Sequence, residues 1–179
     1  MERKTVLSLF FMLGFIGCCI WGCERAASYS DIPEIGFKSL VFEYVNTPMG
    51  NKLMAVLICS FVDGDGDIGV RTRNDSISKI HYIWYKKLPD MTYVPHQFPS
   101  GSIADSTVIP WGSVMNKEEA HNKSLKGTIR IALDKPANIQ GIDTMRIEFY
   151  IVDRARNPSN IEYTPDFSIQ NLPTEPITK

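Results

Sequence analysis

Strict alternation of apolar and polar residues is the most regular pattern along this chain. In residues 125–133 the odd positions are apolar or glycine, whereas Lys126, Thr128 and Arg130 stand between them. Residues 145–152 repeat the pattern, with Arg146 and Glu148 between apolar side chains. A period of two is typical of a β-strand with one face buried and the other facing water.

Other short windows are rich in β-branched and aromatic residues and are separated by residues that favour turns. The predicted strands cover 37–45, 53–62, 78–88, 125–133, 145–152, 161–163 and 167–169. The intervening residues 89–123 contain four prolines and predict loop and short strand, with one helical turn over 116–122. Pro165 interrupts the last strand, which suits the edge of a sheet.

About seven short strands without a long helical period predict an all-β fold. An immunoglobulin or fibronectin III-like β-sandwich over residues 37–171 fits this pattern best, and a small barrel is the alternative. Residues 172–179 are expected to form a C-terminal tail. The polar residues 23–36, which contain Pro33 and Gly36, predict a tether in front of the domain.

The first 22 residues have the parts of an export signal. Arg3 and Lys4 precede an apolar run over 6–20, and Gly22 stands directly before Cys23. The run is shorter than the roughly 20 apolar residues of a membrane-spanning helix. This pattern predicts a lipoprotein signal peptide that is removed before Cys23, which becomes lipidated; Cys18 is the second choice. The protein is then expected in the cell envelope, bound to a membrane by its lipid. The outer membrane is favoured, and both its periplasmic face and its outer face remain as alternatives.

Removal of the signal changes the charge and the cysteine count. The remaining chain has 17 basic and 19 acidic residues, and no clustered basic stretch indicates a nucleic-acid partner. Cys59 is then the one cysteine left besides the lipidated residue, inside an apolar strand. A small buried thiol is the interpretation that we prefer there, and the domain is expected to fold without a disulfide.

One acidic motif follows the predicted strand 53–62. In Asp63-Gly-Asp-Gly-Asp67-Ile-Gly69, three carboxylates stand at every second position, a pattern that can wrap oxygen atoms around a hard cation such as calcium. It is not an EF-hand loop, because Ile68 replaces the required glycine and Asn74 replaces the final glutamate.

A second polar cluster, Asp153-Arg-Ala-Arg-Asn157-Pro-Ser-Asn160, follows the strand 145–152. In an immunoglobulin-like topology the strands before the two clusters end at the same end of the sandwich. The candidate calcium ligands are therefore Asp63, Asp65, Asp67, Asp153 and Asn157.

A purely structural interpretation of these loops is preferred over calcium at this point. Asp and Gly are common turn residues, and Asp side chains bind their own backbone in tight loops. Four arginines could also neutralise the carboxylates without a metal, namely Arg71, Arg73, Arg154 and Arg156.

No catalytic residues are predicted. His81, His96 and His121 lack the spacing of a zinc site, and no nucleophile, phosphate-loop or dinucleotide motif is present. Aromatic residues could form a sugar-stacking platform, but most such rings are sandwich core. We expect Trp84 in the core and leave Trp111 open; the other members of the set are Tyr82, Tyr85 and Tyr93.

The signal ending in Cys23, the segment 60–69 and the segment 153–160 together resemble a group of small uncharacterised lipoproteins from Bacteroidota-type bacteria. In that group, Phe-x-Asp-Gly-Asp-Gly-Asp-Ile-Gly is followed late in the chain by Asp-Arg-Ala-Gly-Asn-x-Ser-Asn. Arg156 departs from the pattern, which has glycine there. The resemblance implies an exported lipoprotein with an immunoglobulin-like domain and O-glycan acceptors at Ser76, Ser106 and Thr144.

These observations predict a non-enzymatic, membrane-anchored lipoprotein without a cofactor. Its β-sandwich would be a binding or structural module of the envelope, and its partner would be an envelope protein or a glycan. The alternative is a calcium-dependent accessory domain that binds carbohydrate or protein.

Overall fold

The computed structural model describes residues 29–48, 50–119, 123–135, 142–169 and 172. The predicted signal peptide, Cys18, Cys23 and the first part of the predicted tether lie outside the described residues, as does most of the predicted C-terminal tail. Within these ranges, no helix has the length and apolar character needed to cross a membrane.

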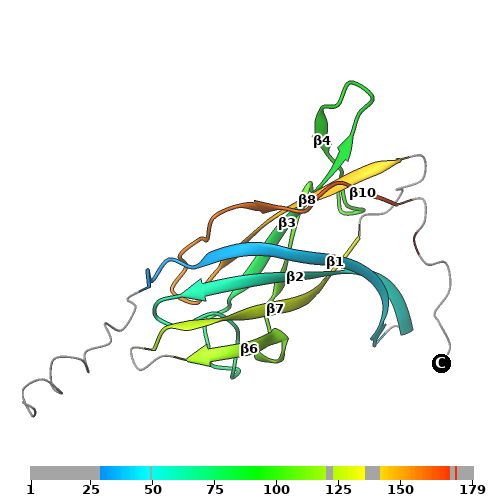
Figure 1. Cartoon of the computed structure of the whole chain (residues 1–179). Helices are drawn as coiled ribbons and strands as arrows, with labels where there is room; N and C mark the ends of the chain where they lie inside the picture. Colours follow the sequence, from blue (N-terminus) through cyan, green and yellow to red (C-terminus); the bar gives the residue numbers. More distant parts are fainter. Residues whose placement is uncertain (1–28, 49, 120–122, 136–141, 170–171, 173–179) are drawn as a thin grey trace, which may run out of the picture.

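The first sheet has four antiparallel strands. In spatial order they are β1 (Glu34–Thr47), β2 (Gly50–Asp63), β7 (Leu125–Leu133) and β6 (Val114–Glu119). The β1–β2 hairpin is long, and its paired register runs from Glu34 opposite Val62 to Thr47 opposite Gly50. Figure 1 shows these four strands side by side.

The second sheet is built around β3 and β8, which pair along nearly their whole length. Its path is β10 (Phe167–Ser168), β8 (Thr144–Val152), β3 (Lys79–Lys87) and β4 (Tyr93–Pro95), with β5 (Ala104–Val108) on β3 and β9 (Glu162–Tyr163) on β8. A short 3₁₀ turn, η1 (Trp111–Ser113), leads into β6.

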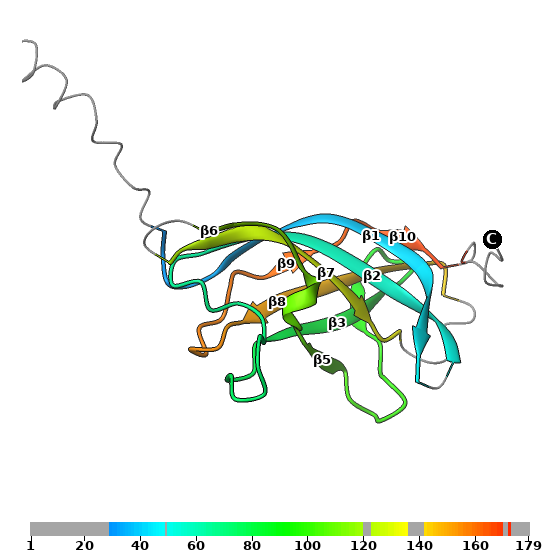
Figure 2. The ribbon, with the colours of Figure 1, turned by 90° about the horizontal axis from the view of Figure 1, so that it is seen from below.

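The two sheets form two layers, as the view in Figure 2 shows. Strands β1, β2, β7 and β6 have the order of the A, B, E and D strands of an immunoglobulin domain. Strands β3, β8 and β10 have the order of C, F and G. The immunoglobulin-like β-sandwich is therefore confirmed, and the barrel alternative is wrong because each described sheet is open.

The core lies between the layers and follows the alternation in the sequence. On β8 the alternate residues Met145, Ile147, Phe149 and Ile151 have 0 % exposure. On β3 the residues Ile80, Tyr82 and Trp84 point inward with at most 2 % exposure. Cys59 on β2 is buried as expected, and burial raises the pKa of its thiol to about 12, so it stays protonated and unreactive.

Two local predictions are wrong. Residues 114–119 form strand β6 instead of starting a helical turn, because they pair with β7 and Glu118 forms an ion pair of 2.7 Å with Lys126 across the two strands. Strand β1 begins at Glu34, inside the predicted tether 23–36, because Pro33 and Ile35 are buried against the domain. The backbone N–H of Ile35 donates a hydrogen bond to the side-chain oxygen of Asn160, a residue far along the chain.

Candidate metal centre

Two strands from different sheets bring the acidic motifs together. Strand β2 ends at Asp63, and Asp153 directly follows β8. Four carboxylates each supply one oxygen to a group in which all the oxygens lie within 4.8 Å of one another: Asp63, Asp65, Asp67 and Asp153. The structure therefore brings the two motifs to one end of the sandwich, as the topology argument predicts. We call these four residues the acidic cluster.

The acidic cluster is buried and incompletely hydrogen-bonded. Asp63 and Asp153 have 0 % exposure. The Oδ1 atoms of Asp63, Asp65 and Asp67 are also buried, and within the described residues none of them has a hydrogen-bond partner. A buried polar atom without a partner costs about 1–3 kcal/mol, and more when it is charged. Four converging carboxylates therefore form an arrangement that is unfavourable unless a positive charge occupies it.

The first loop is held by its own aspartate and by an apolar anchor. The backbone N–H groups of Asp67 and Ile68 donate to Oδ2 of Asp63, at 2.8 and 3.2 Å. Ile68, which breaks the EF-hand pattern, is fully buried in the core. The loop is thus fixed by packing at the position where an EF-hand uses a flexible glycine, and Oδ1 of Asp63 remains available.

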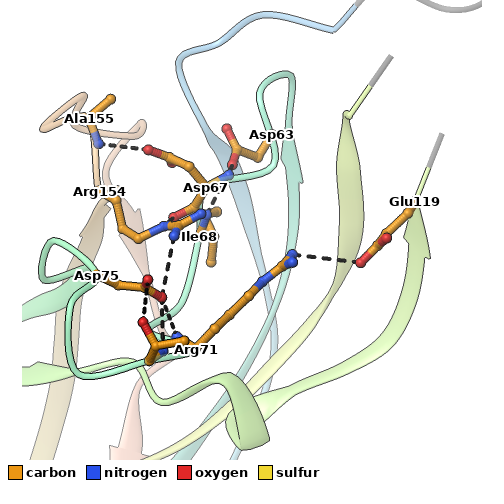
Figure 3. A network of polar contacts seen from close by, with 9 residues as sticks. Asp63, Asp67, Ile68, Arg71, Asp75, Glu119, Arg154 and Ala155 are labelled. Atoms are coloured by element: carbon orange, nitrogen blue, oxygen red, sulfur yellow. Dashed lines mark hydrogen bonds and ion pairs between the residues drawn. The ribbon is translucent and has the colours of Figure 1, made fainter. Parts of the chain in front are cut away.

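The second loop supports the same arrangement. Oδ1 and Oδ2 of Asp153 accept hydrogen bonds from the backbone N–H and the side-chain amide of Asn157, at 2.7 and 2.9 Å. The backbone N–H of Ala155 donates to Oδ2 of Asp67 at 2.7 Å, which joins the two loops directly (Figure 3). Arg156 has a positive φ of 77°, a backbone conformation that glycine adopts most readily.

Glycine is required at two places in the first loop. A side-chain carbon at Gly64 would lie 2.5 Å from the carbonyl oxygens of Tyr29 and Ser30. At Gly66, which has φ +68°, such a carbon would lie 2.1 Å from the carbonyl oxygen of Lys123. The loop is therefore packed closely against two other parts of the backbone.

Mutual repulsion and burial change the acidity of the cluster. Burial raises the pKa of Asp63 to about 7, and the charges of Asp65 and Asp67 add to this rise, while the two backbone hydrogen bonds oppose it. Burial also raises the pKa of Asp67, with the charges of Asp153 and Asp65 as further causes. Both shifts have the same physical cause, since several negative charges lie close together at a site where two of the four carboxylates are fully buried.

Among the described residues no arginine forms an ion pair with the acidic cluster, and the predicted neutralisation is limited to the charge of Arg154, which opposes the rise in the pKa of Asp67. Arg154 donates from Nε to the backbone oxygen of Asp67 at 2.7 Å, but its ion pair goes to Asp75 at 3.4 Å. Arg71 forms its ion pair with Glu119, at 3.6 Å. Figure 3 shows the side chain of Arg71 extending to Glu119 and that of Arg154 lying between Asp67 and Asp75. The turn-forming role of Asp63 is confirmed, whereas the Asp–Arg pairing is replaced by contacts to acids outside the cluster.

The remaining candidate residues separate clearly. The side-chain amide nitrogen of Asn157 donates to Oδ2 of Asp153 at 2.9 Å and so positions this carboxylate, while Asn157 itself stays a predicted ligand. Tyr82 and Trp84 are core residues and not a sugar platform, while Tyr85 and Tyr93 are half-buried. Trp111 is half-buried between the cations of Arg71 and Lys117, at 3.8 and 4.3 Å from the ring centroid.

The N-terminal segment, residues 29–35, is a part of the site that sequence reasoning missed. Gly64 N–H donates to the carbonyl oxygen of Ser30 at 2.8 Å, and the side-chain amide of Asn157 donates to that of Asp31 at 3.3 Å. Asn160 binds both the N–H and the carbonyl of Ile35, at 2.8 and 3.0 Å. The spacing of residues within the loops gives no signal for these contacts, because those of Asn157 and Asn160 join residues about 125 positions apart.

Comparison of the chain with models of known protein families, with curated proteins and with solved structures gave no match.

Proposed function

We propose that this chain is an exported, lipid-anchored envelope protein whose β-sandwich is a calcium-dependent binding module. The observation that carries the calcium assignment is the set of buried, unpartnered Oδ1 atoms of Asp63, Asp65 and Asp67, which converge with an oxygen of Asp153. An empty cluster of this kind is electrostatically costly, and a divalent cation removes that cost directly.

Calcium fits the donor set better than other common metals. The converging atoms are all carboxylate oxygens, which hard cations prefer, and the set lacks the nitrogen and sulfur ligands of zinc. Two oxygens on opposite sides of a calcium ion, each about 2.4 Å from it, lie about 4.8 Å apart. The oxygens of the acidic cluster all lie within that distance of one another, 4.8 Å, so one ion can contact all four. Magnesium needs a smaller, near-octahedral set in which several ligands stay water.

A bound ion would join three parts of the chain. The loop after β2 and the loop after β8 supply the carboxylates, and each loop also holds the N-terminal segment, through Gly64 and Asn157 respectively. In the lipoprotein interpretation this segment leads back to the anchor at Cys23. Calcium would then fix the orientation of the domain relative to its membrane attachment, in addition to ordering a binding surface.

The anchor and the location rest on the sequence of the first 23 residues, and the absence of enzymatic activity rests on the lack of a catalytic motif. A glycan or an envelope protein is the proposed partner, and nucleic acid is not. Incorporation of labelled palmitate that is lost in Cys23→Ala but retained in Cys18→Ala would support the anchor.

The calcium assignment is tested by isothermal titration of the chelator-treated protein. We expect one calcium ion per chain and a loss of affinity of at least about tenfold in Asp67→Asn, because one charged ligand is removed while the side chain keeps its shape. Asp31→Asn is the matched control, since this exposed aspartate lies near both loops but contributes only its carbonyl oxygen. Equal titrations of wild type and Asp67→Asn, or no binding by wild type, would contradict the proposal and leave the loops as structural turns.

A further inference from the structure

A polar pocket of about 440 Å³ adjoins the acidic cluster. Its lining residues come from the loop after β2, from β6 and β7 and from the loop after β8: Asp65, Gly66, Arg71, Glu119, Lys123, Leu125 and Arg154. Asp65 belongs both to this lining and to the acidic cluster, so the pocket lies directly beside the proposed calcium ion. Its volume is in the range that holds a small molecule.

The ligands of the proposed ion leave room for oxygens from outside the protein. Asp63 and Asp67 each use Oδ2 to accept backbone hydrogen bonds, and both oxygens of Asp153 accept from Asn157. Asp63 and Asp67 therefore each keep Oδ1 for the ion, whereas an oxygen of Asp153 would bind the ion while it also accepts a hydrogen bond. Four carboxylate oxygens are fewer than the six to eight that calcium takes, so further positions remain for other oxygens, among them those of water or of a ligand.

Positive charge dominates the wall of the pocket once the ion neutralises Asp65. Arg71, Lys123 and Arg154 face one remaining acid, Glu119. Arg71 is oriented by stacking on Trp111, with 3.8 Å from the guanidinium carbon to the ring centroid. Its ion pair with Glu119 is long, at 3.6 Å, and the two side chains are 42 % and 62 % exposed. Such a pair contributes little stability, so a ligand can replace it at low cost.

We infer that this pocket binds a carboxylate-bearing sugar whose carboxylate bridges the calcium ion and the cations of Arg71 and Lys123. The inference rests on the proposed calcium site and adds the class of ligand. The planar guanidinium of Arg71 matches a carboxylate in a two-point contact. Glu119 accepts hydrogen bonds, which the hydroxyl groups of a sugar donate and a simple acid does not.

The test uses ¹⁵N-labelled, calcium-loaded protein titrated with D-glucuronate and D-galacturonate, with glucose and galactose as neutral partners of the same shape. We expect the backbone signals of Arg71, Lys123 and Arg154 to shift with either uronate, and the shifts to disappear when calcium is chelated. Arg71→Gln should lower uronate affinity by about tenfold, because the charged two-point contact is lost. Lys117→Gln is the matched control, since Lys117 also lies over Trp111 but does not line the pocket.

Each other outcome overturns the inference in a distinct way. Equal shifts with the neutral sugars would remove the carboxylate from the assignment. Equal affinity for N-acetylglutamate amide would reassign the pocket to an acidic peptide. Uronate binding that persists without calcium would show that the carboxylate does not bridge to the ion. If protein that still binds calcium shows no signal shifts with uronate, the pocket does not bind this ligand, and the proposed function is unaffected. Failure to bind calcium at all would instead overturn the proposed function.

Discussion

Strand β8 leads to two groups of polar side chains, one along the strand itself and one directly after its end. The acids in the two groups find their hydrogen-bond donors in different ways. Near its beginning, Arg146 and Glu148 lie on the outer face of the sheet with three tyrosines. Directly after its end, Asp153 joins the acidic cluster. Both groups gather polar side chains from distant parts of the chain. In the acidic cluster, however, the Oδ1 atoms of Asp63, Asp65 and Asp67 have no hydrogen-bond donor among the described residues.

In the tyrosine group, which we define as Tyr85, Tyr93, Tyr163, Arg146 and Glu148, the acid has donors of its own, and the one buried atom without a hydrogen-bond partner among the described residues of the group is Nε of Arg146. Glu148 accepts hydrogen bonds from the hydroxyls of Tyr85 and Tyr163, at 3.2 and 2.8 Å. The guanidinium of Arg146 lies over the rings, closest to Tyr93 at 3.6 Å. This is a cation–π contact, a favourable place for a positive charge that has few acceptors.

Asp166 beside the tyrosine group shows the electrostatic difference most plainly. Hydrogen bonds from Lys87 and Tyr93, both 2.8 Å, reach its carboxylate. The contact with Lys87 is the main cause that lowers the pKa of Asp166 below its ordinary value. Asp63 has the opposite shift, to about 7. A carboxylate with its own cation is easily ionised, whereas a buried carboxylate among others resists ionisation until a cation is supplied.

The largest expected effect comes from ionisation of Asp63 without calcium. Its ordinary pKa is 3.8 and its pKa in the folded domain is about 7. Between these values the folded state holds a proton that the unfolded chain releases, so the free energy of unfolding falls as pH rises. At about 1.4 kcal/mol per pKa unit, the loss is at most about 4 kcal/mol.

Asp63→Asn removes this ionisation and keeps the two backbone hydrogen bonds on Oδ. In chelator, the variant should become more stable than wild type as pH rises from about 4 to about 7. Urea unfolding of both proteins at several pH values measures the difference. Saturating calcium should reverse the order at neutral pH, because it stabilises only the protein that binds it. If the free energy of unfolding of the two proteins changes with pH in the same way in chelator, ionisation of Asp63 does not destabilise the folded domain.

An intermediate effect is expected for Gly66→Ala. The substitution combines a positive φ with a contact of 2.1 Å to the carbonyl oxygen of Lys123, so the loop must shift. We expect a loss of about 2 kcal/mol in unfolding free energy and weaker calcium binding. Gly101→Ala is the matched control, because Gly101 has φ +82° but nothing within 4 Å of the added carbon. Equal losses in the two variants would attribute the effect to backbone strain alone and separate it from the site.

The smallest effect is expected at the tyrosine group. Tyr163→Phe removes one hydrogen bond to Glu148, and the tyrosine is 43 % exposed, so water can replace it. The loss should be about 1 kcal/mol or less. Thermal unfolding with and without calcium should give the same loss, because this group is complete without an ion. A calcium-dependent loss would show that the two ends of β8 are coupled and would break the comparison.

The strands could be predicted from the sequence where one of their faces is buried. The meeting of the two acidic motifs could be predicted because it depends only on the strand topology. Alternation located β7 with its bounds unchanged and β8 within one residue. The assignment of β2 and β8 to facing strands of an immunoglobulin-like fold was enough to bring Asp63 near Asp153. These features depend on short-range periodicity and on a single fold rule.

Other features depend on contacts that leave no local pattern. Strand β6 was missed because its polar residues face solvent at a sheet edge, and pairing with β7 overrides their weak preference. The expected ion pairs of arginines with the cluster are absent among the described residues because nearness in sequence does not set the direction of a long side chain. Arg71 instead extends to Glu119 and stacks on Trp111. The hydrogen bonds from Asn157 and Asn160 to residues 29–35 could not be predicted, because they join residues that only the folded chain brings together.

The most direct measurement is a crystal structure of the domain grown with calcium. The account predicts one ion surrounded by oxygens of Asp63, Asp65, Asp67 and Asp153 at about 2.3–2.6 Å, with the remaining positions filled by water or ligand on the side of the Asp65 pocket. Water molecules or an arginine side chain donating to the three Oδ1 atoms, with no ion between the two loops, would contradict it.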